Sequence, residues 1–204
     1  MAPPRNLRRR RALADAAIEV LGTAGIHGLS HRAADERAGL PPGTASNYFP
    51  SRDGLLEAAA RRVAELQLAD MQSADARVAA PAGPEQLAGL IGGSLYDSAT
   101  RHRTRFLAIC ELALEATRRP ALGEVMARVA AASLDVTLAE HRALGLPTSP
   151  EQVQALVTLF GGVLLTLVTG PPAAVTPDAT LLLARCMVTG VLGTVPAADP
   201  GTPS

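Results

Sequence analysis

The stretch GLSHRAADERAGLPPGTASNYFPSRDGLL, residues 28–56, predicts two short helices joined by a tight turn. Ser30 is a good N-cap for a helix that continues to Ala38, and Gly39 can end that helix in a left-handed conformation. The prolines at 41–42 cannot lie inside a helix but can open one, so a second helix is predicted over residues 43–49. This spacing is typical of a helix-turn-helix, whose second helix enters the DNA major groove.

The second helix has a polar surface that suits DNA. Its hydroxyl and amide groups can bond base edges and phosphate oxygens. They belong to Thr44, Ser46, Asn47 and Tyr48. Further candidate DNA contacts lie at the starts of the two neighbouring helices: Ser30, His31, Arg32 and Arg52. Each of these alone would also fit a solvated loop or a surface pair, but their combination at this spacing favours a DNA reader.

These residues resemble the DNA-binding domain of the TetR family of transcriptional regulators. The family's landmarks follow in order over residues 10–60: an alanine-rich first helix, a glycine-containing loop, and a capped helix that ends in Ala-Gly at 38–39. A Gly-Thr-x-x-x-Tyr-Phe recognition segment follows at 43–49, and Arg-Asp-x-Leu-Leu opens the fourth helix at 52–56. The resemblance implies that Tyr48 and Arg52 contact phosphates. It also implies base-edge or phosphate contacts for Thr44, Ser46 and Asn47.

Four positions depart from the family pattern. Asp35 stands where a small apolar residue is usual, which predicts altered packing or a local pair with Arg32. Ala45 and Ser46 replace a bulkier, aromatic pair, so the preferred DNA sequence should differ from that of the best-known members. His31 stands where threonine is common, and it is either a pH-dependent phosphate contact or a plain hydrogen bonder.

Helical periodicity dominates the rest of the chain, and the predicted fold class is all-α. The first helix is predicted over residues 7–24, ended by Gly25 with Gly28 in the following loop. The fourth should continue from 52 to about 78. Later helices are predicted over 85–100, 104–118, 120–144, 150–169 and 177–193.

The predicted organisation has four parts. Residues 1–11 form a basic N-terminal arm, 12–60 a helix-turn-helix DNA-binding domain, 61–195 a helical ligand-binding and dimerisation domain, and 196–204 a disordered tail. Charge supports this division, because residues 1–62 hold 10 arginines against 6 acidic residues while residues 63–204 hold 9 against 13. A basic front on an acidic body indicates an anionic partner for the front. The four arginines at 8–11 could touch DNA or form a solvated tail.

The composition argues against other classes of protein. The chain has 204 residues, of which 48% are hydrophobic, and only five aromatic residues, too few for a base-stacking platform. No metal-ligand or nucleophile–base spacing is visible, so no cofactor or metal is expected and a helical enzyme is the weaker alternative. Cys110 and Cys186 are expected to be buried free thiols in a cytoplasmic protein. The longest apolar run, residues 156–168, is shorter than a membrane span.

The C-terminal half is expected to dimerise. Residues 150–169 are apolar on two faces, which calls for two packing partners, and the resemblance implies that one is a second copy of the chain. A buried helix pair in a monomer is the alternative. The expected interface residues are Leu156, Leu159, Val163, Leu167, Leu183, Met187 and Val191. A two-fold dimer presents two recognition helices, so the expected operator is a pseudo-palindrome in double-stranded DNA.

The resemblance also implies a pocket for an unidentified small-molecule effector. The candidates are apolar, which favours a hydrophobic ligand, although side chains at helical spacing are also typical of a plain core. They are Tyr96, Phe106, Cys110, Leu114, Met126 and Phe160. The expected function is therefore a transcriptional repressor that the effector releases from DNA. A regulator of the same fold without such a ligand is the alternative.

Overall fold

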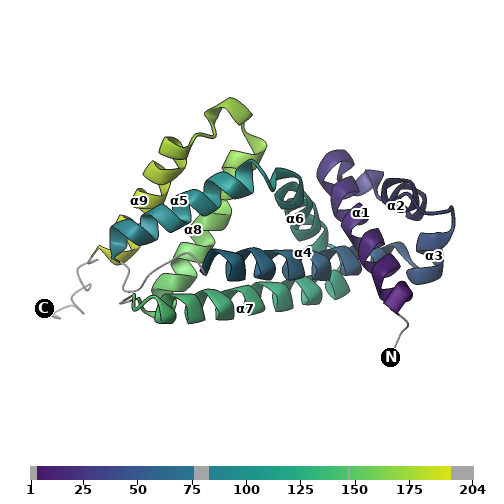
Figure 1. Ribbon diagram of the computed structural model, residues 1–204, viewed down its shortest axis with the longest axis horizontal. Coiled ribbons are helices and arrows are strands. Elements are labelled where there is room, and N and C mark those ends of the chain that lie inside the picture. The colour runs from purple at the N-terminus through teal and green to yellow at the C-terminus, as the bar shows by residue number, and fades with distance from the viewer. Residues whose placement is uncertain (1–3, 76–82, 147, 194–204) are drawn as a thin grey trace, which may run out of the picture.

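The computed structural model of the chain describes residues 4–75, 83–146 and 148–193. Nine α-helices and one 3-10 turn occupy these ranges (Figure 1). They are α1 (Pro4–Gly28), α2 (His31–Ala38), α3 (Thr44–Tyr48), α4 (Arg52–Asp75), α5 (Pro84–Ala99), α6 (Arg103–Ala116), α7 (Pro120–Ala143), α8 (Pro150–Thr169), η1 (Pro172–Ala174) and α9 (Pro177–Leu192). The described part of the chain contains no strand, and the all-α prediction is confirmed.

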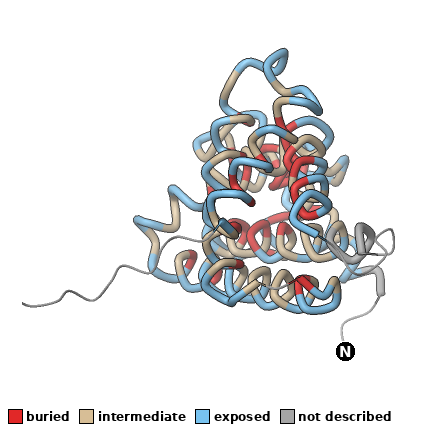
Figure 2. Tube along the Cα trace, turned by 90° about the vertical axis from the view of Figure 1, so that its left-hand side faces the viewer, coloured by how far each residue is buried: buried red, intermediate tan, exposed pale blue. Residues whose placement is uncertain are grey.

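The first three helices form a compact head at one end of the molecule (Figure 1). From this head α4 runs beside α7 toward the opposite end, where α5, α8 and α9 form the body. Helix α1 packs on α6, and α5 packs on α9. Buried positions lie where these helices meet, while their outer faces are exposed (Figure 2). The head is therefore attached to the body through α4 and α6.

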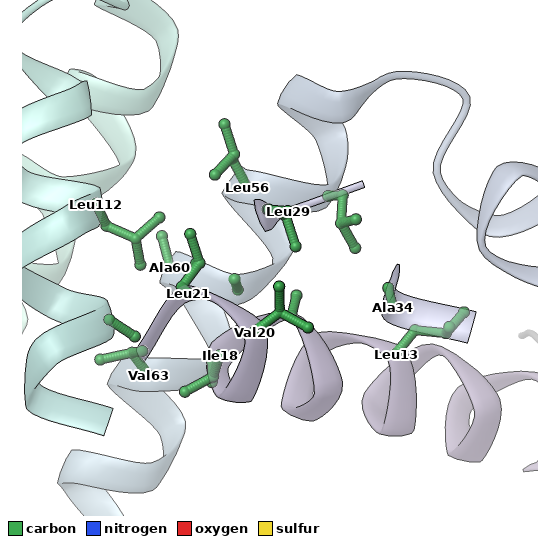
Figure 3. Packing of buried hydrophobic residues seen from close by; sticks show 14 of the residues in the cluster. Leu13, Ile18, Val20, Leu21, Leu29, Ala34, Leu56, Ala60, Val63 and Leu112 are labelled. Carbon is green, nitrogen blue, oxygen red and sulfur yellow. The ribbon is translucent and has the colours of Figure 1, made fainter. Parts of the chain in front are cut away.

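Two hydrophobic cores hold these parts together, and α6 contributes to both. In the first core, Leu21 of α1 and Val63 of α4 pack with Leu112 of α6, all nearly inaccessible to solvent (Figure 3). The second core joins α5, α8 and α9, with Phe106 and Cys110 of α6 packed against its edge. Burial of one large aliphatic side chain stabilises a fold by roughly 1.5–3 kcal/mol. The head's core thus continues past residue 60 into the body.

The N-terminal helix differs from its predicted bounds at both ends. It already begins at Pro4, so the arginines at 8–11 belong to its first turns and form no separate arm. Gly25 does break the helix, with φ 69° and ψ −176°, but a further turn follows and reaches Gly28. The end of the fourth predicted helix beyond residue 75 and the tail at 196–204 lie outside the described residues.

Candidate nucleic-acid interface

The turn between α2 and α3 is built as the sequence predicts. The Ser30 hydroxyl accepts a hydrogen bond from the Ala33 N–H at 3.1 Å, which caps α2. Gly39 ends that helix in the left-handed region at φ 63°, and Gly43 has φ 85° directly before α3. Only glycine adopts such angles without strain. These two glycines therefore set the angle at which α3 leaves α2.

A buried carboxylate fixes the start of α3. Asp35, only 2% exposed, accepts hydrogen bonds from the Gly43 N–H at 2.8 Å and the Ala45 N–H at 2.7 Å. The predicted pair between Asp35 and Arg32 is wrong, because Arg32 points outward and its Nε donates to Glu36 at 2.8 Å. The first amides of a helix lack partners within the helix, so a carboxylate placed there satisfies them. Asp35 thus joins α2 to the start of α3.

The outward side chains of α3 are polar. Ser46 and Asn47 are exposed, and Thr44 and Tyr48 are half-buried. The Thr44 hydroxyl donates to the Pro41 carbonyl at 2.6 Å, so its remaining capacity toward an external group is as an acceptor. The donors that α3 can offer to an outside partner are therefore the Ser46 hydroxyl, the Asn47 amide and the Tyr48 hydroxyl.

Two flanking candidates contact the chain's own backbone. His31 Nε2 lies 2.7 Å from the Phe49 carbonyl; a carbonyl only accepts, so Nε2 carries the hydrogen. This geometry fits the simpler predicted role of His31, that of a hydrogen bonder. Arg52 donates from Nε to the Leu29 carbonyl at 3.0 Å and from Nη2 to the Ile26 carbonyl. Both residues hold the ends of neighbouring helices in place around α3.

The joint between the head and α6 escaped the sequence analysis. The Ile26 N–H donates to Glu111 Oε2 at 2.8 Å, just after the break at Gly25. Gly22 faces Thr104 so closely that a β-carbon there would lie 2.1 Å from the Thr104 carbonyl oxygen. These partners are more than 80 residues apart in the chain, so no local pattern could have paired them.

The candidate pocket residues fall into separate environments. Phe106 and Cys110 of α6 and Phe160 of α8 each pack against the second core. Burial raises the pKa of the Cys110 thiol, and the Glu111 carboxylate adds to this shift. The other candidates lie elsewhere: Met126 packs against the first core, Tyr96 is half-buried on α5, and Leu114 is 61% exposed. Leu114 is therefore a surface residue in the chain as described, not part of an enclosed pocket.

The expected interface residues divide between core and surface. Leu156 and Met187 are only 4% and 6% exposed and belong to the chain's own second core. Leu159 is 43% exposed, and the remaining four are half-buried: Val163, Leu167, Leu183 and Val191. The structure adds two exposed leucines that the sequence analysis missed, Leu165 at 48% and Leu182 at 62%.

The outer side of α8 and α9 also carries small residues. No atom lies within 4 Å of a β-carbon built at Gly161, Gly162 or Gly190, so open space stands above all three. Cys186 is exposed, in contrast to the buried thiol expected there. By length and composition alone α8 could cross a membrane, and only 22% of its most apolar window is buried. This side of the body, uncovered within one chain, thus carries exposed leucines and glycines beside polar residues such as Thr158 and Thr166.

The sequence matches two families of regulatory proteins. Residues 13–59 match the family described as bacterial regulatory proteins, tetR family, and residues 82–193 match a C-terminal domain described as tetracyclin repressor-like. The HTH-type transcriptional regulator BetI of Cronobacter sakazakii is 31% identical over 160 residues, which are 77% of this chain and 78% of that protein.

Solved structures show the same architecture. The multidrug binding protein EbrR complexed with ethidium superposes with a TM-score of 0.65 and 31% identity, over 90% of this chain and 98% of that one. A member of the TetR family from Streptomyces coelicolor A3 gives a TM-score of 0.66 and 31% identity, over 90% and 97% of the two chains. The helix-turn-helix head, the helical body and these matches lead to one conclusion: the chain belongs to the TetR family of DNA-binding transcriptional regulators.

Proposed function

We propose that the protein is a repressor that binds a pseudo-palindromic operator as a homodimer and is released by a small hydrophobic ligand. The observation that carries the proposal is the α3 surface, where Ser46 and Asn47 face solvent on a helix whose start is fixed by Asp35. Exposed polar groups on a rigid short helix are suited to reading base edges. Such a protein acts in the cytoplasm, where it meets chromosomal DNA.

In the proposed complex the contacts divide by chemistry. Ser46 and Asn47 bond base edges in the major groove, because they are the exposed side chains of α3. The Tyr48 hydroxyl donates to a phosphate. The remaining candidates surround α3 and set its approach to the backbone: Ser30, His31, Arg32, Thr44 and Arg52. Because His31 and Arg52 already bond main-chain carbonyls, their contribution is to hold the neighbouring helices in place around α3.

The uncovered side of α8 and α9 supports the homodimer. Leu159, Leu165 and Leu182 are large and exposed, and open space stands above the glycines at 161–162. Helices approach closely where side chains are small, and burial of exposed leucines against a second copy removes apolar surface from water. Large contiguous apolar patches are uncommon on monomers. A second copy of this chain also places two α3 helices on two half-sites.

The edge of the second core is the proposed effector site. Phe106, Cys110 and Phe160 each pack against that core while remaining partly exposed, and the related protein EbrR has been solved with ethidium. An aromatic and thiol lining suits a hydrophobic or amphipathic ligand. Since α6 carries Phe106 and Cys110 as well as Glu111, which accepts a hydrogen bond from Ile26 of α1, a ligand that shifts α6 also shifts α1 and α4. The ligand weakens DNA binding only if it binds the released state more tightly.

Selection of bound sequences from random duplex DNA tests the proposed function. The wild-type protein should enrich two related half-sites separated by about one helical turn. Tyr48→Phe, which keeps the ring, should weaken binding without changing the motif, whereas Asn47→Ala should relax one position in each half-site. Gln86→Ala removes an exposed amide of α5 and is the matched control.

The outcomes separate the parts of the proposal. No enrichment at low salt contradicts DNA recognition, and a single unpaired half-site contradicts the dimer. Release of the selected duplex by ethidium, with no release from a Phe160→Glu variant, would support the effector site. A screen of hydrophobic compounds in which none releases the duplex would favour the same-fold regulator without a ligand.

A further inference from the structure

A groove lies between the N-terminal end of α1 and the recognition helix α3. Its volume is about 480 Å³, and α1 contributes Asn6, Arg9 and Arg10 while α3 contributes Asn47 and Tyr48. The described residues that line it include two arginines and no carboxylate. A hollow with this lining has a positive potential and favours an anion.

The four arginines at 8–11 have different surroundings, because consecutive residues of a helix point about 100° apart. Arg11 extends toward Glu65 of α4, with 3.7 Å between Nη2 and Oε2. Arg10 lies over the Phe49 ring at 4.7 Å and donates to the Tyr48 carbonyl at 3.3 Å, so it fastens α1 to the end of α3. Within the described part of the chain, neither Arg8 nor Arg9 makes a hydrogen bond or an ion pair.

Arg9 is therefore the free cation of the groove. It lines the hollow on the α1 side, opposite the Tyr48 side chain on the α3 side. The Arg10 contacts hold these two walls together, so the groove exists before any ligand arrives. Arg9 and Tyr48 line the same groove, and an unpaired guanidinium beside a tyrosine suits a phosphate group, which accepts two N–H bonds from an arginine.

We propose that this groove holds a DNA backbone phosphate, with the Arg9 guanidinium as its main partner and the Asn6 amide and Tyr48 hydroxyl as further donors. The inference rests on the proposed function and adds a contact from outside the helix-turn-helix. Because the groove borders α3, its phosphate belongs to the strand beside the major groove that α3 enters. The contact adds affinity that depends on salt and carries no sequence preference.

The salt dependence of binding tests this site. The experiment measures the affinity of the full chain for a duplex selected by the wild-type protein, from low to high salt. Arg9→Ala should reduce the magnitude of the slope of log K against log salt by about 0.9 per chain. The ratio of the wild-type to the Arg9→Ala binding constant should therefore fall about eightfold per chain for each tenfold rise in salt. Arg9→Lys should keep the slope, and Arg128→Ala, an exposed arginine of α7, is the control for net charge.

Neutral phosphate analogues locate the contact. Replacement of single operator phosphates by methylphosphonate should reveal one position per half-site at which the wild-type protein loses affinity and the Arg9→Ala variant does not. Equal slopes for wild type and Arg9→Ala, with DNA binding still weakened by Tyr48→Phe, would overturn the phosphate site and leave the proposed function intact. If the wild-type protein binds no duplex at low salt, the phosphate site and the proposed function are both contradicted.

Discussion

The head and the body of the molecule use polar groups in opposite ways. In the head, buried or half-buried side chains bond main-chain atoms across turns: Asp35 bonds the start of α3, His31 bonds its end, and Arg52 bonds the end of α1. In the body, the helices pack mainly through aliphatic side chains, and large leucines such as Leu182 remain exposed. Hydrogen bonds within the head fix its helices relative to one another, whereas the body leaves large apolar side chains exposed to solvent.

This difference matches two physical tasks. A surface that reads DNA needs fixed geometry, and hydrogen bonds to backbone atoms provide it because they depend on direction. A surface that packs against a second copy, or that moves when a ligand enters, needs apolar contacts, which are not directional. Substitutions in the head should therefore cost more stability than substitutions on the exposed side of the body.

Asp35→Ala should have the largest effect. The change leaves the buried Ala45 amide and the partly buried Gly43 amide without their acceptor, at a cost of roughly 3 kcal/mol in the free energy of unfolding. DNA affinity should fall further than stability alone explains, because α3 loses its fixed start. Thermal unfolding and duplex binding measure the two quantities. Glu36→Ala, which removes only an exposed pair with Arg32, should change stability by less than about 1 kcal/mol.

Gly22→Ala should separate the head from α6. The added methyl group would lie 2.1 Å from the Thr104 carbonyl oxygen, so the two helices must move apart, at a cost of roughly 1–3 kcal/mol. Gly93→Ala is the matched control, because this exposed glycine of α5 has no atom within 4 Å of its added β-carbon. There alanine should stabilise the helix by about 0.5–1 kcal/mol. Equal melting temperatures for the two variants would contradict the close joint.

Leu182→Glu should weaken the proposed dimer while leaving the single chain folded. The side chain is 62% exposed in one chain, so a charge there costs little until a second copy covers it. The dimer dissociation constant should rise at least about tenfold, or ~1.4 kcal/mol, by analytical ultracentrifugation. Leu114→Glu places the same charge on an equally exposed leucine of α6 and should leave association unchanged. Dissociation in both variants would place the interface elsewhere.

Acid should weaken the body through His141, with the smallest effect of the four. This histidine is 7% exposed, and burial lowers its pKa below the ordinary value of 6.5. The unfolded chain then binds a proton at higher pH than the folded chain, so stability is complete above about pH 6.5 and declines as the pH falls toward the folded-state pKa. The loss should be about 1 kcal/mol or less. His141→Gln should flatten this part of the stability profile measured by thermal unfolding.

The local features of the head were predictable from the sequence. The Ser30 cap, the left-handed Gly39 and the second helix after Pro41 and Pro42 follow from short-range preferences, and the structure confirms each of them. The partners of Asp35 were not predictable, since the Gly43 and Ala45 amides lie eight and ten residues away across the turn. Side chains three or four residues apart on a helix are neighbours, so the sequence alone predicted an ion pair between Asp35 and Arg32.

The body was predictable as helices but not as surfaces. Periodicity placed α8 and α9 well, yet it could not say which of two apolar faces the chain itself covers. Leu156 is buried and Leu165 is exposed, because the covered face depends on where α5, α6, α7 and α9 pack against α8. Cys186 was predicted to be buried and is exposed for the same reason, because its burial depends on which face of α9 the other helices cover. The hydrogen bond between Glu111 and Ile26 was not predictable, because Ile26 lies 85 residues earlier in the chain.

The hydrogen bonds that hold α3 have a consequence for how this regulator can change over evolution. They run to main-chain atoms at Gly43, Ala45 and Phe49, whose backbone groups are present whatever side chains the helix displays. Ser46 and Asn47 make no part of this support and face outward. In the proposed complex with DNA, substitutions at these two positions therefore redirect the protein to a new set of genes without a loss of folding, and an engineer can vary them as a small combinatorial library on an unchanged scaffold.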